Sequence, residues 1–279
     1  MQKTVSNIYE IIDPLNGHFL IAGKNGSGMS GGLLQIVKGM LENWVNLTAS
    51  SDGFTLVDPY GDNLTIVVNI LLHMEYKGAD IQWGKVHYIA KADPRPLQTE
   101  LESWLDGGHV ILWGRGFSEQ DAKMYHKIVS ADDISSNASH VLIVDNVFFA
   151  PWQVLTQMLM EDRKYNLTIG LAPHFLDDID ESLLRTIFDN IQTFISFGLS
   201  RSSIVAASKM VSDVSEETFQ NLKMLEFVYS TPQGFHYEPE RVEPIRLHLP
   251  NGEAVDCRDF QGIHEAIEYA HEKLMELTV

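Results

Sequence analysis

The sequence is nearly free of cysteine, because only Cys257 among its 279 residues is one. A single cysteine cannot form an intramolecular disulfide, and it cannot supply the several thiolates of a cysteine-based zinc site. The chain is therefore expected to fold without such cross-links and to work in a reducing compartment.

Basic residues are also scarce. Twenty lysines and arginines stand against 38 aspartates and glutamates, which gives a net charge of −18. Affinity for nucleic acid comes largely from cations that release counterions from phosphates, so the average charge disfavours DNA as a partner and leaves room only for a local basic groove. The same charge favours a basic protein partner.

Long apolar runs are missing as well, although a membrane-spanning helix needs about 20 apolar residues. Residues 66–72 are interrupted by Asn69, and residues 141–150 by Asp145 and Asn146. The first residues lead into no apolar signal region. We expect a cytoplasmic protein without a membrane span.

What remains is an ordinary globular composition, with 44% hydrophobic, 21% charged and 10% aromatic residues. Short apolar segments rich in β-branched residues alternate with longer helical patterns. The expected strands are 19–22, 54–57, 86–90, 110–113, 140–144, 167–171 and 193–197, and the expected helices are 33–44, 64–74, 119–129, 152–162 and 182–188. Continuous apolar strands separated by helices predict an α/β fold, with a mostly parallel sheet covered by helices on both faces.

Beyond about residue 200 the alternation weakens. Helical fragments at 204–210 and 216–222 precede a strand-like segment at 226–229, and Pro239, Pro244 and Pro250 interrupt an extended stretch. A last helix has apolar residues at spacings of three and four, namely Phe260, Ile263, Ile267, Ala270, Leu274 and Leu277. This amphipathic stripe predicts a helix docked on the sheet, since it is too short for a coiled coil.

A glycine-rich loop follows the first expected strand and opens the first long helix, as a phosphate-binding loop requires. Its residues, our candidates for binding a nucleotide, are Gly23, Lys24, Asn25, Gly26, Ser27, Gly28, Met29 and Ser30. The pattern G-x-x-x-x-G-K-[ST] is met except at its lysine, where Met29 stands. That lysine places a positive charge on the β- and γ-phosphates, so its loss predicts weak ATP binding or none, and impaired hydrolysis. Lys24 offers two alternatives: it substitutes for the missing charge, or it points to solvent.

A second motif ends the strand at 140–144. Asp145 is the candidate that holds Mg²⁺ together with Ser30, and Asn146 stands where a glutamate usually activates water. An amide cannot accept a proton as a carboxylate does. Met29 and Asn146 therefore both lack the charge that the usual lysine and glutamate supply at these two catalytic positions.

Together with these motifs, four further segments carry a family resemblance. They are Val57-Asp58-Pro59-Tyr60-Gly61-Asp62, the run from Glu161 to Leu167, the run from Leu171 to Leu176, and the run from Asn190 to Phe197. In their order and spacing over roughly residues 17–234, the chain resembles the HerA–FtsK superfamily of DNA-pumping P-loop ATPases, particularly the coupling-protein ATPases of conjugation and type IV secretion.

The resemblance implies a RecA-like core at residues 17–212, with a lead-in at 1–16 and a C-terminal extension at 213–279. It implies a homo-oligomer or a ring with a related ATPase, Mg²⁺ and ATP between subunits, DNA through the centre, and protein partners from a DNA-transfer or secretion machinery. By position, Arg163 or Lys164 reaches a neighbour's nucleotide, His174 replaces a sensor glutamine, and Asp58 belongs to the nucleotide site.

Simpler roles stay open for these residues. Asp58 and Asp62 cap the following helix equally well, Arg163 and Lys164 suit a helix end, and His174 fits a structural hydrogen bond. We therefore carry three hypotheses: a hydrolysis-defective P-loop subunit with a structural or regulatory role, an active DNA translocase that uses Lys24, and an acidic module that docks a basic secretion partner.

Overall fold

The computed structural model describes residues 8–12, 17–46, 52–93, 95, 97–131, 139–145, 151–161, 165–211, 214–256 and 258–278. Three candidate site residues, Asn146, Arg163 and Lys164, lie outside these ranges, as does Cys257.

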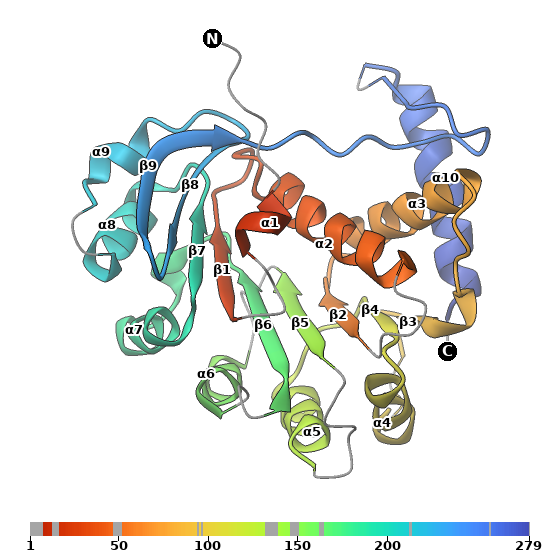
Figure 1. Cartoon of the computed structure of the whole chain (residues 1–279), viewed down its shortest axis with the longest axis horizontal. Coiled ribbons are helices and arrows are strands. Elements are labelled where there is room, and N and C mark those ends of the chain that lie inside the picture. The colour runs from red at the N-terminus through yellow and green to blue at the C-terminus, as the bar shows by residue number, and fades with distance from the viewer. Residues whose placement is uncertain are drawn as a thin grey trace.

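One nine-stranded sheet organises the chain (Figure 1). Its order is β3-β4-β2-β5-β6-β1-β7-β8-β9. The strands from β3 to β7 in this order pair parallel with one another, whereas β8 pairs antiparallel with both β7 and β9. The strands are β1 (Phe19–Ala22), β2 (Gly53–Val57), β3 (Val86–Ile89), β4 (Val110–Trp113), β5 (His140–Asp145), β6 (Leu167–Ala172), β7 (Thr193–Ser196), β8 (Glu226–Thr231) and β9 (Gly234–Arg241). The mostly parallel α/β sheet predicted from the sequence is confirmed.

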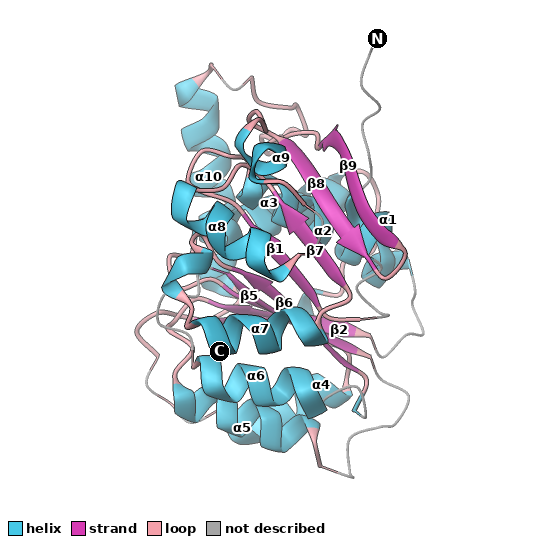
Figure 2. Ribbon diagram, turned by 90° about the vertical axis from the view of Figure 1, so that its left-hand side faces the viewer, coloured by secondary structure: helices cyan, strands magenta, loops and turns pink. Residues whose placement is uncertain are grey.

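Helices cover both faces of the sheet (Figure 2). The α-helices are α1 (Ile8–Ile12), α2 (Met29–Asn46), α3 (Asp62–Tyr76), α4 (Gln98–Asp106), α5 (Glu119–Val129), α6 (Trp152–Glu161), α7 (Glu181–Asn190), α8 (Arg201–Met210), α9 (Glu216–Gln220) and α10 (Phe260–Glu276). One hydrophobic cluster joins the sheet to α4–α9 and includes Leu20 and Leu142, while the other joins it to α1–α3 and α10 and includes Phe19 and Val141. Because neighbouring strand residues enter opposite clusters, the inner strands are apolar throughout.

Three elements were not predicted from the sequence, namely the short helix α1, helix α4 and strand β9. Helix α4 buries only Leu101, Trp104 and Leu105 between polar residues, so its pattern is short. Strand β9 contains Pro239, and a proline usually indicates that a strand is interrupted. A proline is compatible with this strand because β9 pairs only with β8 and forms the edge of the sheet.

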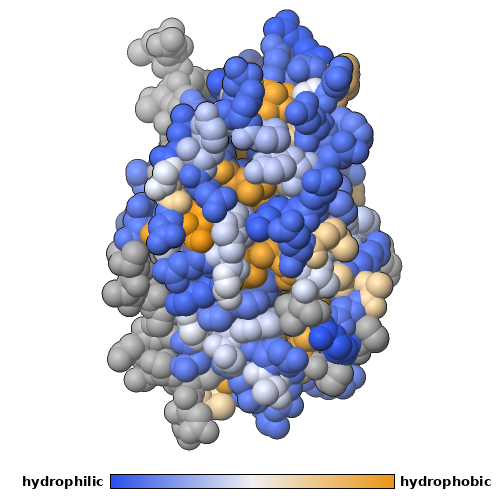
Figure 3. All heavy atoms as spheres, turned by 90° about the vertical axis from the view of Figure 1, so that its right-hand side faces the viewer, coloured by the Kyte–Doolittle hydropathy of each residue, from blue (hydrophilic) through white to orange (hydrophobic). Residues whose placement is uncertain are grey.

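The expectation that the last helix docks on the sheet is wrong in its main contact. Helix α10 packs along α3 and buries Gly262, Ala266, Ala270 and Leu274, residues four apart that are mostly small. Just past the end of α10, the Tyr88 amide of β3 donates to the Leu277 carbonyl at 3.0 Å and ties the helix to the edge of the sheet. The apolar stripe of α10 is wider than the face that α3 covers. Phe260, at the start of α10, is 83% exposed. Figure 3 shows hydrophobic patches on this side of a largely hydrophilic surface.

A buried polar network lies at the start of β5. The Thr55 hydroxyl is 3.0 Å from both the Tyr125 hydroxyl and His140 Nε2, and His140 is only 6% exposed. Burial lowers the pKa of His140 from its usual 6.5 to about 3, with a smaller contribution from His109. His140 is therefore neutral in the folded protein.

This histidine predicts acid sensitivity. Its folded pKa lies below its unfolded value, so between about pH 6.5 and pH 3 the unfolded chain binds the extra proton and stability falls as the pH falls. We expect His140→Gln to remove about 1.4 kcal/mol per pH unit of this dependence. Urea unfolding at several pH values measures it, with the exposed His264→Gln as control. Equal pH slopes for wild type and His140→Gln would contradict the prediction.

Candidate functional site

The glycine-rich loop connects β1 to α2, at the carboxyl end of a strand flanked by β6 and β7. Gly26 and Gly28 have φ angles of 77° and 99°, a left-handed conformation that glycine adopts readily. The Ser27 amide donates to the Lys24 carbonyl at 3.0 Å and closes a turn, while the Lys24 amide donates to the Gly198 carbonyl at 2.9 Å. The loop is therefore a fixed turn at the tip of an inner strand.

Backbone amides gather where the loop enters α2. The helix begins at Met29, and its first backbone bond from this region runs from the Gly32 amide to the Gly28 carbonyl at 3.0 Å. Within the described residues, the amides of Gly28, Met29 and Ser30 donate to no backbone carbonyl. Such amides, together with the helix dipole, favour an anion.

Met29 does not occupy the loop surface. Its side chain is 2% exposed and belongs to the same hydrophobic cluster as Leu33 and Phe197. A Cβ atom added to Gly23 would lie 3.0 Å from Met29 Cβ, so this side chain starts close beneath the loop. Lys24, in contrast, is exposed. The loop thus presents Lys24 outward and keeps an apolar group at the position of the usual lysine.

A segment distant in sequence also contacts the loop. Leu225, just before β8, has a φ of 68°, and its amide donates to the Ser27 carbonyl at 2.8 Å. A Cβ atom at Gly28 would lie 2.9 Å from Leu225 N, so only glycine fits here without a shift. Local sequence patterns could not predict this contact, because it depends on how β8 joins the sheet.

The acidic candidates on β2 and β5 meet through a residue that the sequence analysis missed. The Asp58 carboxylate accepts from the Asn63 amide at 2.9 Å and from the Tyr60 amide at 3.0 Å. Asn63 Nδ2 in turn donates to Asp145 Oδ2 at 2.6 Å. All three residues are buried, with Asp58 2%, Asp145 3% and Asn63 8% exposed. Asp58 thus holds the start of α3, which fits the structural alternative, and Asn63 links it to Asp145.

One signal in the sequence could have identified Asn63. It is a polar residue in the first turn of α3, a helix whose buried residues are mostly apolar. Asp62, its neighbour in the same motif, is exposed and does not join these contacts.

His174 lies where β6 ends, beside β1. Its Nδ1 is 3.3 Å from the Gly23 carbonyl oxygen, and the side chain is half-buried. The structure therefore brings this candidate to the base of the glycine loop, in a contact that also suits a structural histidine.

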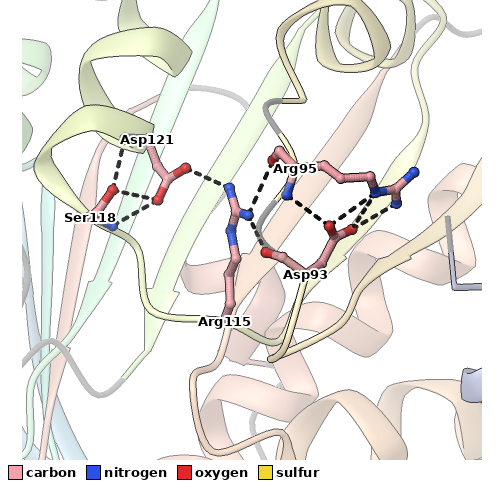
Figure 4. Close-up of polar contacts among 5 residues, drawn as sticks. All are labelled: Asp93, Arg95, Arg115, Ser118 and Asp121. Carbon is pink, nitrogen blue, oxygen red and sulfur yellow. Dashed lines mark hydrogen bonds and ion pairs between the residues drawn. The ribbon is translucent and has the colours of Figure 1, made fainter.

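Another polar cluster fixes the loops that follow β3 and β4 (Figure 4). Arg115 donates to the Asp121 carboxylate at 2.7 Å and to the Asp93 carbonyl at 2.5 Å, while Asp121 and Ser118 form the capping box of α5. The Arg95 side chain hydrogen-bonds Asp93 and lowers the pKa of that carboxyl to about 2. Arg115, which the sequence analysis did not single out, thus joins two loops at the carboxyl end of the parallel strands, the end at which the glycine loop also lies.

The fold matches solved structures of P-loop NTPases. The genome packaging NTPase B204 from Sulfolobus turreted icosahedral virus 2, in complex with AMPPCP, aligns with a TM-score of 0.54 and 14% identity over 83% of this chain and 98% of B204. The plasmid coupling protein TrwB, in complex with the GTP analogue GDPNP, aligns with a TM-score of 0.58 and 14% identity over 88% of this chain and 91% of TrwB.

The sequence matches no protein-family model and no curated protein. At 14% identity the structural likeness establishes the fold, which is that of the P-loop NTPases, and the activity has to be argued from the site. In the part of the chain that the structure describes, no helix is long and apolar enough to cross a membrane, and no three metal-ligating side chains are grouped for a metal ion.

Proposed function

We propose that this chain is a hydrolysis-defective P-loop subunit of the HerA–FtsK superfamily, with a structural or regulatory role in a machinery that transfers or packages DNA. The observation that carries the proposal is Met29, a 2% exposed apolar side chain at the position of the phosphate-binding lysine, directly beneath a loop of the expected shape.

Nucleotide binding is part of the proposal. The amides of Gly28, Met29 and Ser30 would hold phosphate oxygens, and the Ser30 hydroxyl with Asp145 would hold Mg²⁺ through the nucleotide. Asn25, Gly26 and Ser27 complete the cradle. Since Asp145 already accepts a hydrogen bond from Asn63, Mg²⁺ would have to compete with or adapt to that contact.

The remaining assignments also stay proposals. Asn146 takes the place of the carboxylate that activates water, Arg163 or Lys164 reaches a neighbouring subunit, and His174 takes the sensor position. The division into a lead-in (1–16), a core (17–212) and an extension (213–279), and assembly with further copies or a related ATPase, belong to the same proposal. The NTPase and coupling-protein names of the structural neighbours support it.

Calorimetry with Mg·ATP and a phosphate-release assay test this function. We expect weak, saturable ATP binding that Ser30→Ala weakens further, and no turnover with or without DNA. Robust turnover that Asp145→Ala abolishes would contradict the proposal.

The active-translocase alternative is supported by the exposure of Lys24 at the loop surface. It predicts DNA-stimulated hydrolysis that Lys24→Ala eliminates, whereas the hydrolysis-defective subunit shows no activity for Lys24→Ala to remove. The third alternative, an acidic module for a basic partner, predicts an association that weakens as salt rises, because exposed charge pairs are screened.

A further inference from the structure

A groove of about 400 Å³ lies away from the glycine loop, between α2, α3 and the segment that follows β9. This crossing segment, residues 242–256, leaves β9 and runs over α2 and α3 toward α10 (Figure 1). The groove residue nearest to Met29 along α2 is Gln35, which comes six residues later, or about 9 Å along the helix at 1.5 Å per residue, and Lys38 comes one turn further on. The groove is therefore separate from the site proposed for ATP, and its volume suits a small ligand.

Hydrogen bonds fix the crossing segment on both helices. Gln35 Nε2 donates to the Glu243 carbonyl at 2.8 Å. Asn69, the residue that interrupts the apolar run of α3, exchanges two bonds with His248: its Nδ2 donates to the His248 carbonyl and its Oδ1 accepts from the His248 amide, both at 2.9 Å. Asn69 is 1% exposed, so this double contact is shielded from water and the walls of the groove are held in place.

Two stacked imidazoles lie in this groove. The rings of His73 and His248 have centroids 3.4 Å apart and planes inclined by 14°. Among the described residues, the Nδ1 atoms of both rings are buried without a hydrogen-bond partner. Burial, followed by Lys77 and Lys38, lowers the pKa of His73. Burial, His73 and the nearby cations together lower the pKa of His248 to about 4.

Three cations and two carboxylates line the groove, a small positive excess in a chain whose net charge is −18. From α2 come Lys38 and Glu42, which form an exposed ion pair at 3.7 Å. From α3 comes Lys77, and from the crossing segment come Arg246 and Glu243. Neither Lys77 nor Arg246 forms an ion pair with a described residue, and every charged side chain that shifts the two histidines is a cation. Two cations without an ion-pair partner therefore lie at the mouth of a groove that contains two stacked imidazoles, an arrangement that favours an anion.

We propose that this groove binds a small organic phosphate, with its phosphoryl group between Lys77 and Arg246 beside the His73–His248 pair and its apolar part against Ile70, Met74 and Ile245. Two unpaired cations match the two charges of a phosphate monoester, and an arginine fork suits its oxygens. The apolar residues in the lining favour an organic ester over the inorganic ion.

Bound phosphate couples to protonation. An anion beside the imidazoles stabilises their charged forms, so it raises both pKa values, and by linkage the protonated protein binds the anion more tightly. Affinity therefore rises as the pH falls. Inorganic sulfate tests this point, because its own charge does not change near neutral pH.

Nuclear magnetic resonance of the histidine rings in the full chain, assigned with His73→Gln and His248→Gln, provides the test. Phenyl phosphate is expected to shift both rings saturably at about tenfold lower concentration than inorganic phosphate, which corresponds to about 1.4 kcal/mol. Sulfate is expected to bind about threefold more tightly at pH 6 than at pH 8. The double substitution Lys77→Gln with Arg246→Gln should weaken the binding of both phenyl phosphate and sulfate by at least about tenfold.

The matched control is Lys123→Gln, which removes an exposed lysine on α5 away from the groove and should leave the titration unchanged. Ser30→Ala should also leave it unchanged, which separates this site from the proposed ATP site. The proposal is overturned if the two rings do not respond to millimolar phenyl phosphate, if the double variant titrates like wild type with its thermal stability intact, or if only an oligonucleotide shifts the rings.

Discussion

Met29→Lys is expected to strengthen ATP binding by about 10- to 100-fold while it destabilises the nucleotide-free protein. A hydrogen bond from an ammonium to phosphate contributes about 1.5–3 kcal/mol, which corresponds to that range of affinity. Without ATP the new charge starts from a position that is 2% exposed, and we expect a loss of about 2–5 kcal/mol in the free energy of unfolding. Calorimetry measures the affinity, and urea unfolding with and without Mg·ATP measures the stability.

Met29→Leu is the matched control, because it conserves volume and adds no charge. It should cost less than about 1.5 kcal/mol and leave ATP affinity unchanged. Tighter ATP binding by both variants would show that packing, and not charge, limits the site. If Met29→Lys folds but gains no affinity, the loop does not hold phosphate, and the proposed nucleotide cradle fails.

Asn63→Asp is expected to destabilise the protein strongly at alkaline pH. The substitution places a carboxyl group where Asn63 Nδ2 now lies 2.6 Å from Asp145 Oδ2, at a site where both residues are buried. Two carboxylates so close cannot both ionise, so the pair retains a proton and its folded pKa rises above the unfolded value of about 4. Because the folded state then binds more protons, stability falls by about 1.4 kcal/mol per pH unit between the unfolded pKa and the raised folded pKa, and levels off above it.

Urea unfolding between pH 5 and pH 8 measures this slope. Asn63→Leu removes the donor without adding a charge, so it should cost about 1–3 kcal/mol, and the additional loss toward pH 8 should be confined to Asn63→Asp. Asp62→Asn changes the exposed neighbour and should be nearly neutral. Mg²⁺ should restore part of the stability of Asn63→Asp, because a divalent cation offsets the repulsion. Equal, pH-independent losses for Asn63→Asp and Asn63→Leu would contradict the contact.

Local patterns predicted much of the fold. The expected helix at 119–129 has the bounds of α5, because Ser118 and Asp121 cap its start and its apolar residues recur on one face. The inner strands were found for a similar reason, since burial on both faces leaves them continuously apolar. Helix α4 and strand β9 were missed because their stability comes from packing and from an edge position, which local periodicity does not reveal.

The glycine loop is the part of the candidate site that the sequence predicted best, because the chemistry of its turn lies within eight consecutive residues. The sequence could not show that Asp58 and Asp145 meet through Asn63, a contact across 82 positions. It also could not show that Leu225 approaches Gly28, since that depends on β8 adding to the edge of the sheet beyond β7.

By itself, the sequence determined the α/β class, the loop at the end of β1 and the replacement of the usual phosphate-binding lysine by Met29, because periodicity and turn chemistry act between near neighbours. Tertiary structure alone decided that Met29 is buried, that Asn69 holds the crossing segment, and that His73 and His248 stack although 175 positions separate them. These features arise where helices and strands pack side by side, and packing partners are chosen by the whole fold.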